Sequence, residues 1–208
     1  MDDQYFALAY RGEARCPVFL NGVLHEEFAE GAFDRPMTYG WQHDAPGEGP
    51  PDDLPAELWL VTKDRSYGFD FHTAFGGHVV SAGFLELLRA GDTGDWQVSR
   101  LQVVSAKGRP IPAKEYSFVR FPRSALLSTE RLVDPERSRI DLRRDGQVKK
   151  VWELRFAESP ERDFFLLDSV ALSGVAFCSR RFAEAAERLG PKGVEFVPLP
   201  GIGSLQSA

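Results

Sequence analysis

Two segments of this sequence, about one hundred residues apart, repeat the same order of helix and turn signals, and this repeat constrains the fold most. Ser81 precedes apolar residues at helical spacing, and Gly91 follows them. Ser179 precedes a similar stripe that stops at Gly190. Serine side chains cap helix N-termini and glycine often ends helices, so each segment predicts one capped helix. After each helix and a short turn, we expect a strand, at 95–105 and 193–199.

The repeat has two interpretations. A duplicated αβ module would produce it, but caps and glycine stops are common to many unrelated helix–strand units. Both interpretations lead to the same fold class, because strand-like runs outnumber the two helices. We therefore predict an α+β fold with a mostly antiparallel β-sheet and two principal helices. Two similar αβ modules are one reading of that architecture.

The remaining strand-like runs are short and are separated by turn signals. Asp145-Gly146 is a favoured turn pair, and it predicts a hairpin between 139–142 and 148–156. The tail after residue 199 carries few residues that would hold it to the body. Further strands are expected at 5–10, 16–20, 57–61, 67–71, 115–121 and 163–172.

The chain is expected to form one domain over 1–208, because no Gly/Ser-rich or charged linker separates the two helical units. Residues 1–54 supply N-terminal strands and a loop rich in proline, glycine and acidic residues. This loop, over 28–54, has no helical or strand periodicity. Residues 55–203 form the remaining core.

Cysteine and histidine are too sparse for a metal centre or a redox site. Cys16 and Cys178 have apolar neighbours and no ligand spacing, so we expect two buried thiols, no metal and no cofactor. His72 and His78 flank a Phe-Gly-Gly turn, and Asp70 is the local carboxylate that could orient one of them. Loop histidines without a catalytic role are the favoured interpretation. Nucleotide-binding, hydrolase and zinc-protease motifs do not occur in the sequence.

Charge is divided unevenly along the chain. Residues 1–100 contain seven basic and seventeen acidic side chains, whereas 101–208 contain eighteen and fourteen. The acidic half is unsuited to nucleic acid and would steer a basic partner. The basic residues near Asp145 alternate with acids, which favours a solvated hairpin with local ion pairs. The 28–54 loop holds the predicted partner-binding residues: Tyr39, Trp41, Asp44, Glu48, Asp52 and Asp53. A second interpretation stays open: the two aromatics pin the loop to the body of the protein, and the acids keep a solvated loop soluble.

A transmembrane helix is not expected, because no apolar run approaches ~18 residues. The N-terminal residues begin with acids and lack the basic and apolar regions of a secretory signal. We therefore expect a cytoplasmic protein that is not associated with membranes.

Six blocks of the sequence carry a family resemblance: 55–59, 80–88, 96–101, 104–105, 136–138 and 192–199. They resemble bacterial polymorphic-toxin immunity proteins. The nearest family that we can name is immunity protein forty-three, with immunity protein eleven as its neighbour. The resemblance runs from about residue 55 to 203.

This resemblance implies a non-enzymatic cytoplasmic protein that binds and neutralises a cognate toxin by stoichiometric occlusion. It brings no catalytic residues to this chain. The acidic half suits a basic toxin such as a nuclease, while the sequence leaves toxin class and oligomeric state open. The alternative is a small-molecule enzyme or ligand-binding protein with a site near Asp70, His72 and His78, and a third reading is a subunit of a larger assembly.

Overall fold

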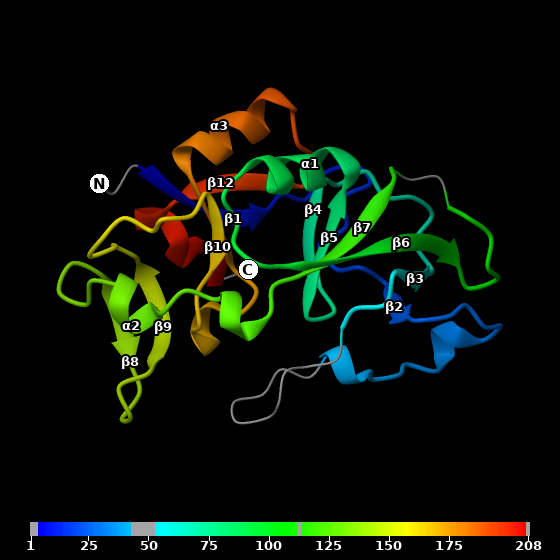
Figure 1. The fold of residues 1–208 in the computed structure, drawn as a ribbon, viewed down its shortest axis with the longest axis horizontal. Helices are drawn as coiled ribbons and strands as arrows, with labels where there is room; N and C mark the ends of the chain where they lie inside the picture. Colours follow the sequence, from blue (N-terminus) through cyan, green and yellow to red (C-terminus); the bar gives the residue numbers. More distant parts are fainter. Residues whose placement is uncertain (1–3, 43–52, 112–113, 207–208) are drawn as a thin grey trace.

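The computed structural model describes residues 4–42, 53–111 and 114–206, with the side chains of 204–206 left aside. Two β-sheets and a separate hairpin make up this part of the chain (Figure 1). Twelve strands and three α-helices are present in the described residues, which confirms the predicted α+β class.

The larger sheet has six strands in the order β2-β3-β6-β7-β5-β4. All neighbours in this sheet are antiparallel except β3 and β6, which run parallel. The sheet is therefore mixed, with one parallel pair in an otherwise antiparallel arrangement. Its strands are β2 (Gly22–His25), β3 (Glu57–Thr62), β4 (Phe71–Ala74), β5 (Gly77–Ser81), β6 (Gln97–Ser105) and β7 (Tyr116–Arg120).

The smaller sheet has four antiparallel strands in the order β10-β11-β1-β12. The first strand of the chain, β1, lies between two strands from its C-terminal third. The members are β1 (Tyr5–Tyr10), β10 (Phe164–Leu166), β11 (Ala176–Ser179) and β12 (Val194–Pro198). The predicted hairpin is also present, as β8 (Arg139–Leu142) and β9 (Val148–Glu153).

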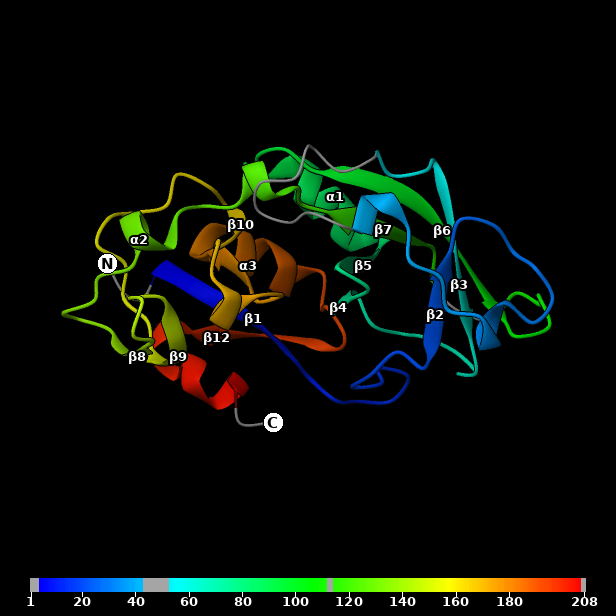
Figure 2. The same ribbon diagram turned by 90° about the horizontal axis from the view of Figure 1, so that it is seen from below.

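Both predicted helices form where their caps indicate. In α1 (Ala82–Ala90), the Ser81 hydroxyl accepts from the Phe84 amide at 3.3 Å. In α3 (Arg180–Arg188), Ser179 Oγ accepts from the Phe182 amide at 3.2 Å. A third, short helix, α2 (Thr129–Leu132), follows the larger sheet. The two longer helices lie side by side (Figure 2).

The two sheets repeat one topology. In the first unit, a β4–β5 hairpin leads through α1 to β6, and β7 fills the gap between β5 and β6. In the second unit, β10 and β11 lead through α3 to β12, and β1 fills the corresponding gap. The structure thus contains two similar αβ modules. The units differ in where their middle strand lies in the sequence. In the first unit the middle strand, β7, follows β6. In the second unit it is β1, which precedes β10 by most of the chain.

Each unit carries an aspartate just before its first strand, and this carboxylate holds the helix cap of its own unit. The Ser81 hydroxyl donates to Asp70 Oδ1 at 2.6 Å. The Ser179 hydroxyl donates to Asp163 Oδ1 at 2.8 Å. A serine hydroxyl can donate and accept at once, so the same oxygen caps the helix and binds the carboxylate.

The same two carboxylates also connect the units to each other. The Lys192 amide, just after α3, donates to Asp70 Oδ2 at 2.8 Å. The Asp92 amide, just after α1, donates to Asp163 Oδ2 at 3.1 Å. Each unit therefore holds the chain that leaves the other unit's helix. This close approach also accounts for Gly91, where a Cβ would lie 3.3 Å from the Asp163 Cβ.

An aromatic cluster fills the space between the units. Phe84 and Phe182, at equivalent places in the two helices, have ring centroids 5.8 Å apart. Phe71 and Phe164, at equivalent places in the two sheets, are 5.9 Å apart. All four side chains are at most 5% exposed. The core thus runs without a break from one unit into the other.

Several predicted elements were wrong. Of the strand expected at 67–71, only Phe71 lies in a strand, and of that expected at 163–172, only 164–166 does, because a 3₁₀ turn forms at 170–172. Residues 16–20 do not form a strand, and the side chains of Val18 and Phe19 are 56% and 83% exposed. The tail is held to the body, because residues Leu199–Gln206 form a 3₁₀ helix in which Ile202 is buried. There the backbone of Gly203 lies so close to Trp152 that a Cβ would come within 2.6 Å of its carbonyl oxygen.

We predict that the two units unfold in one cooperative transition because they share the aromatic cluster. Phe84→Ala should lower the free energy of unfolding by about 3–5 kcal/mol. Hydrogen exchange followed by mass spectrometry should then show faster exchange in peptides from both sheets. Phe19→Ala is the matched control, with an expected change within about 0.5 kcal/mol because this ring is exposed. Faster exchange confined to the six-stranded sheet would contradict the prediction.

Candidate functional site

Side-chain hydrogen bonds hold the segment after β2, residues 26–42, to the larger sheet. His25 Nδ1 lies 3.1 Å from the Tyr39 hydroxyl, and His25 Nε2 lies 2.9 Å from the Ala32 carbonyl oxygen. The Trp41 indole donates to Glu26 Oε1 at 2.9 Å. These bonds tie two short 3₁₀ turns, Ala32–Asp34 and Gly40–Gln42, to the end of β2.

Trp41 serves as an internal anchor of this segment. Its side chain is 2% exposed, stacks on Tyr39 at 5.8 Å and meets Phe118 edge-on at 5.7 Å. Tyr39 is half-buried. The partner-binding role of these two aromatics stays a prediction, and the surface that they support consists of exposed residues 34–38, including Met37 at 58% exposure.

The four predicted acidic residues divide between described and undescribed parts of the chain. Asp44, Glu48 and Asp52 lie outside the described residues. Asp53 is exposed, and its Oδ1 accepts from Gln97 Nε2 at 3.0 Å. This hydrogen bond ties Asp53, near the end of the 28–54 loop, to the first residue of β6.

The two histidines near the Phe-Gly-Gly turn lie on strands, so the expectation of loop histidines was wrong. His72 is in β4 opposite Val79, and His78 is in β5 opposite Thr73. Because alternate residues of a strand face opposite sides, the two imidazoles point away from each other. His72 contacts Tyr10, whereas His78 stacks on Phe71.

Each histidine has local partners that account for its burial. Thr73 donates to the Gly174 carbonyl oxygen at 3.1 Å, so its hydroxyl oxygen can accept from His78 Nδ1, 3.1 Å away. His72 lies within 3.2 Å of the carbonyl oxygens of Thr73 and Val18. Burial lowers the pKa of both imidazoles, that of His78 to about 4.

Asp70 belongs to the helix cap and not to a histidine pair. Its carboxylate binds the Ser81 hydroxyl, the Lys192 amide and Lys114 Nζ, which is 2.6 Å from Oδ1. The structure thus does not bring Asp70, His72 and His78 together. Within the described ranges, no group of three or more His, Cys, Asp or Glu side chains could hold a metal ion.

Both cysteines are buried free thiols, as predicted. Burial raises the pKa of Cys16 and of Cys178, which keeps both in the thiol form.

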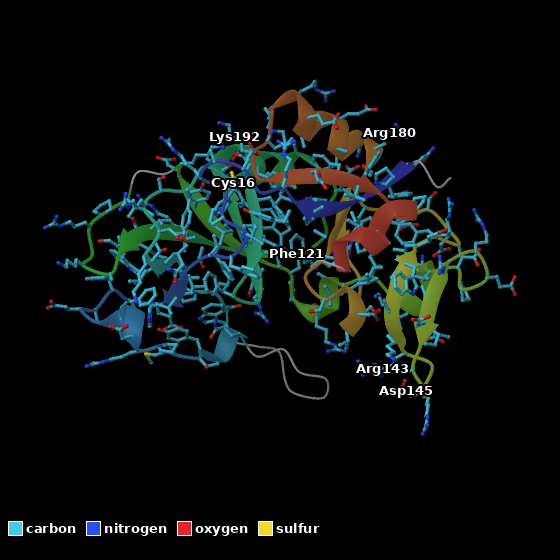
Figure 3. All side chains as sticks on the ribbon, turned by 180° about the vertical axis from the view of Figure 1, so that it is seen from behind. Cys16, Phe121, Arg143, Asp145, Arg180 and Lys192 are labelled. Carbon is cyan, nitrogen blue, oxygen red and sulfur yellow. The ribbon has the colours of Figure 1, made fainter. Side chains whose placement is uncertain are left out.

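The β8–β9 hairpin presents cations at a projecting tip. Figure 3 shows Arg143 and Asp145 at this end, away from the two sheets. Of the local ion pairs expected from the sequence, Arg137–Asp134 forms just before β8, at 3.8 Å, and none is found between the described residues of the hairpin itself. Its acids bond to N–H groups instead: Asp141 accepts from the Trp152 indole at 3.4 Å, and Asp145 accepts from the Gln147 amide at 3.1 Å.

The cations of the hairpin fall into two groups. Arg139 and Lys150 lie over the Trp152 ring, at 5.7 and 3.7 Å from its centroid. Such cation–π contacts hold a charge in place without neutralising it. The others are exposed and form no ion pair within the described part of the chain: Arg143, Arg144 and Lys149.

Beside the hairpin lies a groove of about 780 Å³. Its walls come from α2, the hairpin and the 3₁₀ turn Val170–Leu172. Two apolar side chains at this groove remain exposed in the free protein, Leu142 at 52% and Val170 at 70%. The sequence did not indicate this surface, because Val170 lies in a run that resembles a strand and the hairpin cations alternate with acids.

The comparison with known families gives a clear result. The model of the family described as Immunity protein 43 matches residues 10–202, nearly the whole chain. The protein belongs to the Immunity protein 43 family. This confirms the resemblance inferred from the sequence and extends it through the N-terminal segment to β1. None of the curated proteins matches the chain.

Membership of the Immunity protein 43 family indicates a role in immunity. The match includes both αβ units, the anchored segment at Tyr39 and Trp41, and the hairpin with its groove. Within the described residues, no helix has the length and apolar character needed to span a membrane.

We predict that the free energy of unfolding depends on pH, because the pKa of His78 differs between the folded and the unfolded protein. The unfolded chain carries this imidazole near its ordinary pKa of 6.5, whereas burial lowers the pKa to about 4 in the folded protein. Between these values the unfolded state binds more protons, so the free energy of unfolding should fall as pH drops from about 6.5 to about 4. The loss attributable to His78 is about 3 kcal/mol at most.

Urea unfolding at several pH values between 7 and 4 measures this effect. His78→Gln removes the titration, and the variant's free energy of unfolding should change less over this pH interval than that of the unmodified protein. Equal pH dependence in both proteins would contradict the assignment.

Proposed function

We propose that this protein neutralises a cognate bacterial toxin by binding it with one-to-one stoichiometry and occluding its active site, in the cytoplasm of the cell that it protects. The observation that carries the proposal is the family match over residues 10–202. An inhibitor of this kind works through a surface and needs no catalytic residue of its own.

The packing of the molecule favours tight binding. Association costs conformational entropy when loops and side chains must be ordered at an interface. Here the exposed rim at 34–38 stands on buried anchors, Trp41 and His25, that are in place before a partner binds. A surface held in this way contributes to affinity because little ordering remains to be done.

No contact of Asp70, His72 or His78 favours the alternative of a small-molecule site near these residues. Asp70 is engaged by Ser81, Lys114 and Lys192, and the two histidines face opposite sides of one hairpin. A surface-binding role is therefore the function proposed.

The proposal is tested by protection and by stoichiometry. The product of the neighbouring upstream gene, where the hypothesis places the toxin, is expressed in a sensitive bacterium, with and without this protein. Co-expression should restore growth, and titration calorimetry of the two purified proteins should give a ratio near one. Undiminished toxicity together with no heat of binding would overturn the proposal.

The acidic residues of the 28–54 loop, called the acidic segment below, should act mainly on the rate of association with the toxin. Its field steers a basic partner at long range, and this attraction weakens as salt shortens the Debye length below ~10 Å. Reversal of Asp44, Glu48, Asp52 and Asp53 to lysine should slow association with the toxin several-fold at low salt and little at high salt. Stopped-flow measurements with both proteins at two salt concentrations check this. Unchanged rates at low salt would show that these acids serve solubility alone.

A further inference from the structure

The cationic tip and the groove beside it form one continuous unpartnered surface. The tip consists of Arg143, Arg144 and Lys149, which lie in or next to the turn between β8 and β9. Ile140 and Leu142, two residues apart on β8, both line the groove. Ile140 is partly buried against the core, whereas Leu142 is 52% exposed, so the apolar lining from β8 is open to solvent at the end next to the tip.

The opposite face of the hairpin is already occupied. Arg139 and Asp141, the alternate residues of β8, are engaged with Trp152 on β9. The C-terminal 3₁₀ helix contacts β9, and just after this strand the Leu154 amide donates to the Leu199 carbonyl oxygen at 3.3 Å. The groove face and the tip are thus the free surfaces of this hairpin.

We infer that the groove and the cationic tip bind a segment of the toxin that carries both apolar and acidic side chains. The apolar residues of that segment contact Leu142 and Val170, and its carboxylates contact the tip. This inference rests on the proposed function and specifies one of the surfaces through which it operates. It also gives the toxin an acidic face, in addition to the basic character that suits the acidic segment.

The chemistry of the groove favours a protein segment over nucleic acid. Three carboxylate residues line the groove itself, Glu130, Asp145 and Asp168, and they would repel a phosphate backbone. They would repel carboxylates too, so the groove suits the apolar side chains of a protein segment and leaves its carboxylates to the tip. The exposed Leu142 and Val170 side chains would gain nothing from phosphate or sugar but would be buried by apolar side chains. Exposed apolar side chains beside charged groups are typical of protein interfaces.

The test compares two charge reversals of equal size. The first changes the tip: Arg143→Glu, Arg144→Glu and Lys149→Glu. The matched control changes three exposed cations away from both the hairpin and the 34–38 rim: Arg65→Glu, Lys107→Glu and Arg109→Glu. All six side chains are exposed, so both variants should fold, which circular dichroism and the unfolding midpoint will establish.

Binding is measured by calorimetry against the toxin domain used in the protection experiment. The tip variant should raise the dissociation constant about tenfold or more, and the control should change it less than about threefold. Val170→Asp should also weaken binding about tenfold, because it places a charge on the apolar part of the interface. Electrophoretic mobility with duplex DNA and with single-stranded RNA is recorded in parallel.

Each outcome bears on one proposal. If the unmodified protein binds the toxin domain and all three variants bind it equally well, the inference is overturned and the proposed function stands. Equal weakening by the tip variant and the control would show an effect of net charge, which also overturns the inference. If the unmodified protein binds DNA or RNA and the tip variant does not, the inference is also overturned. If the unmodified protein neither binds the toxin domain nor protects against it, the proposed function fails and the inference fails with it.

Discussion

The exchange of hydrogen bonds through Asp70 and Asp163 is the interaction on which the rest of the structure depends. Each carboxylate holds the N-terminal cap of one helix and the chain that leaves the other helix. A buried carboxylate is costly unless its oxygens are bonded, and here both oxygens of each group have partners. The two αβ units are therefore fixed in one relative position, which brings Phe84 against Phe182 and Phe71 against Phe164.

The N-terminal strand completes this arrangement. The gap between β11 and β12 is filled by β1, so the second unit has no complete sheet until the first residues of the chain join it. In the first unit the corresponding strand, β7, follows directly after β6. The family match begins at Tyr10, the last residue of β1, and continues through the strands that follow in both units. The segment carrying Tyr39 and Trp41 connects β2 to β3, two neighbouring strands of the larger sheet.

The features proposed for binding lie on elements outside the shared core. The rim at 34–38 belongs to the connection between β2 and β3, and the cationic tip belongs to a hairpin that pairs with neither sheet. The core can thus stay constant while these two surfaces vary. The first half of the chain is acidic, whereas the hairpin tip is basic. These opposite charges would fit a partner whose own charge is unevenly distributed.

The sequence by itself determined both long helices and the β8–β9 hairpin, because caps, glycine stops and the Asp145-Gly146 turn act within a few residues. It also placed the chain among immunity proteins. Only the tertiary structure decided the burial of Trp41, the exposure of Phe19 and the faces of His72 and His78. These depend on strand pairing and on which segment covers which side chain, and such contacts join residues far apart in the chain. Local signals carry no information about them. For the same reason, the cations at the tip could be counted in the sequence, but their lack of ion pairs was decided by the fold.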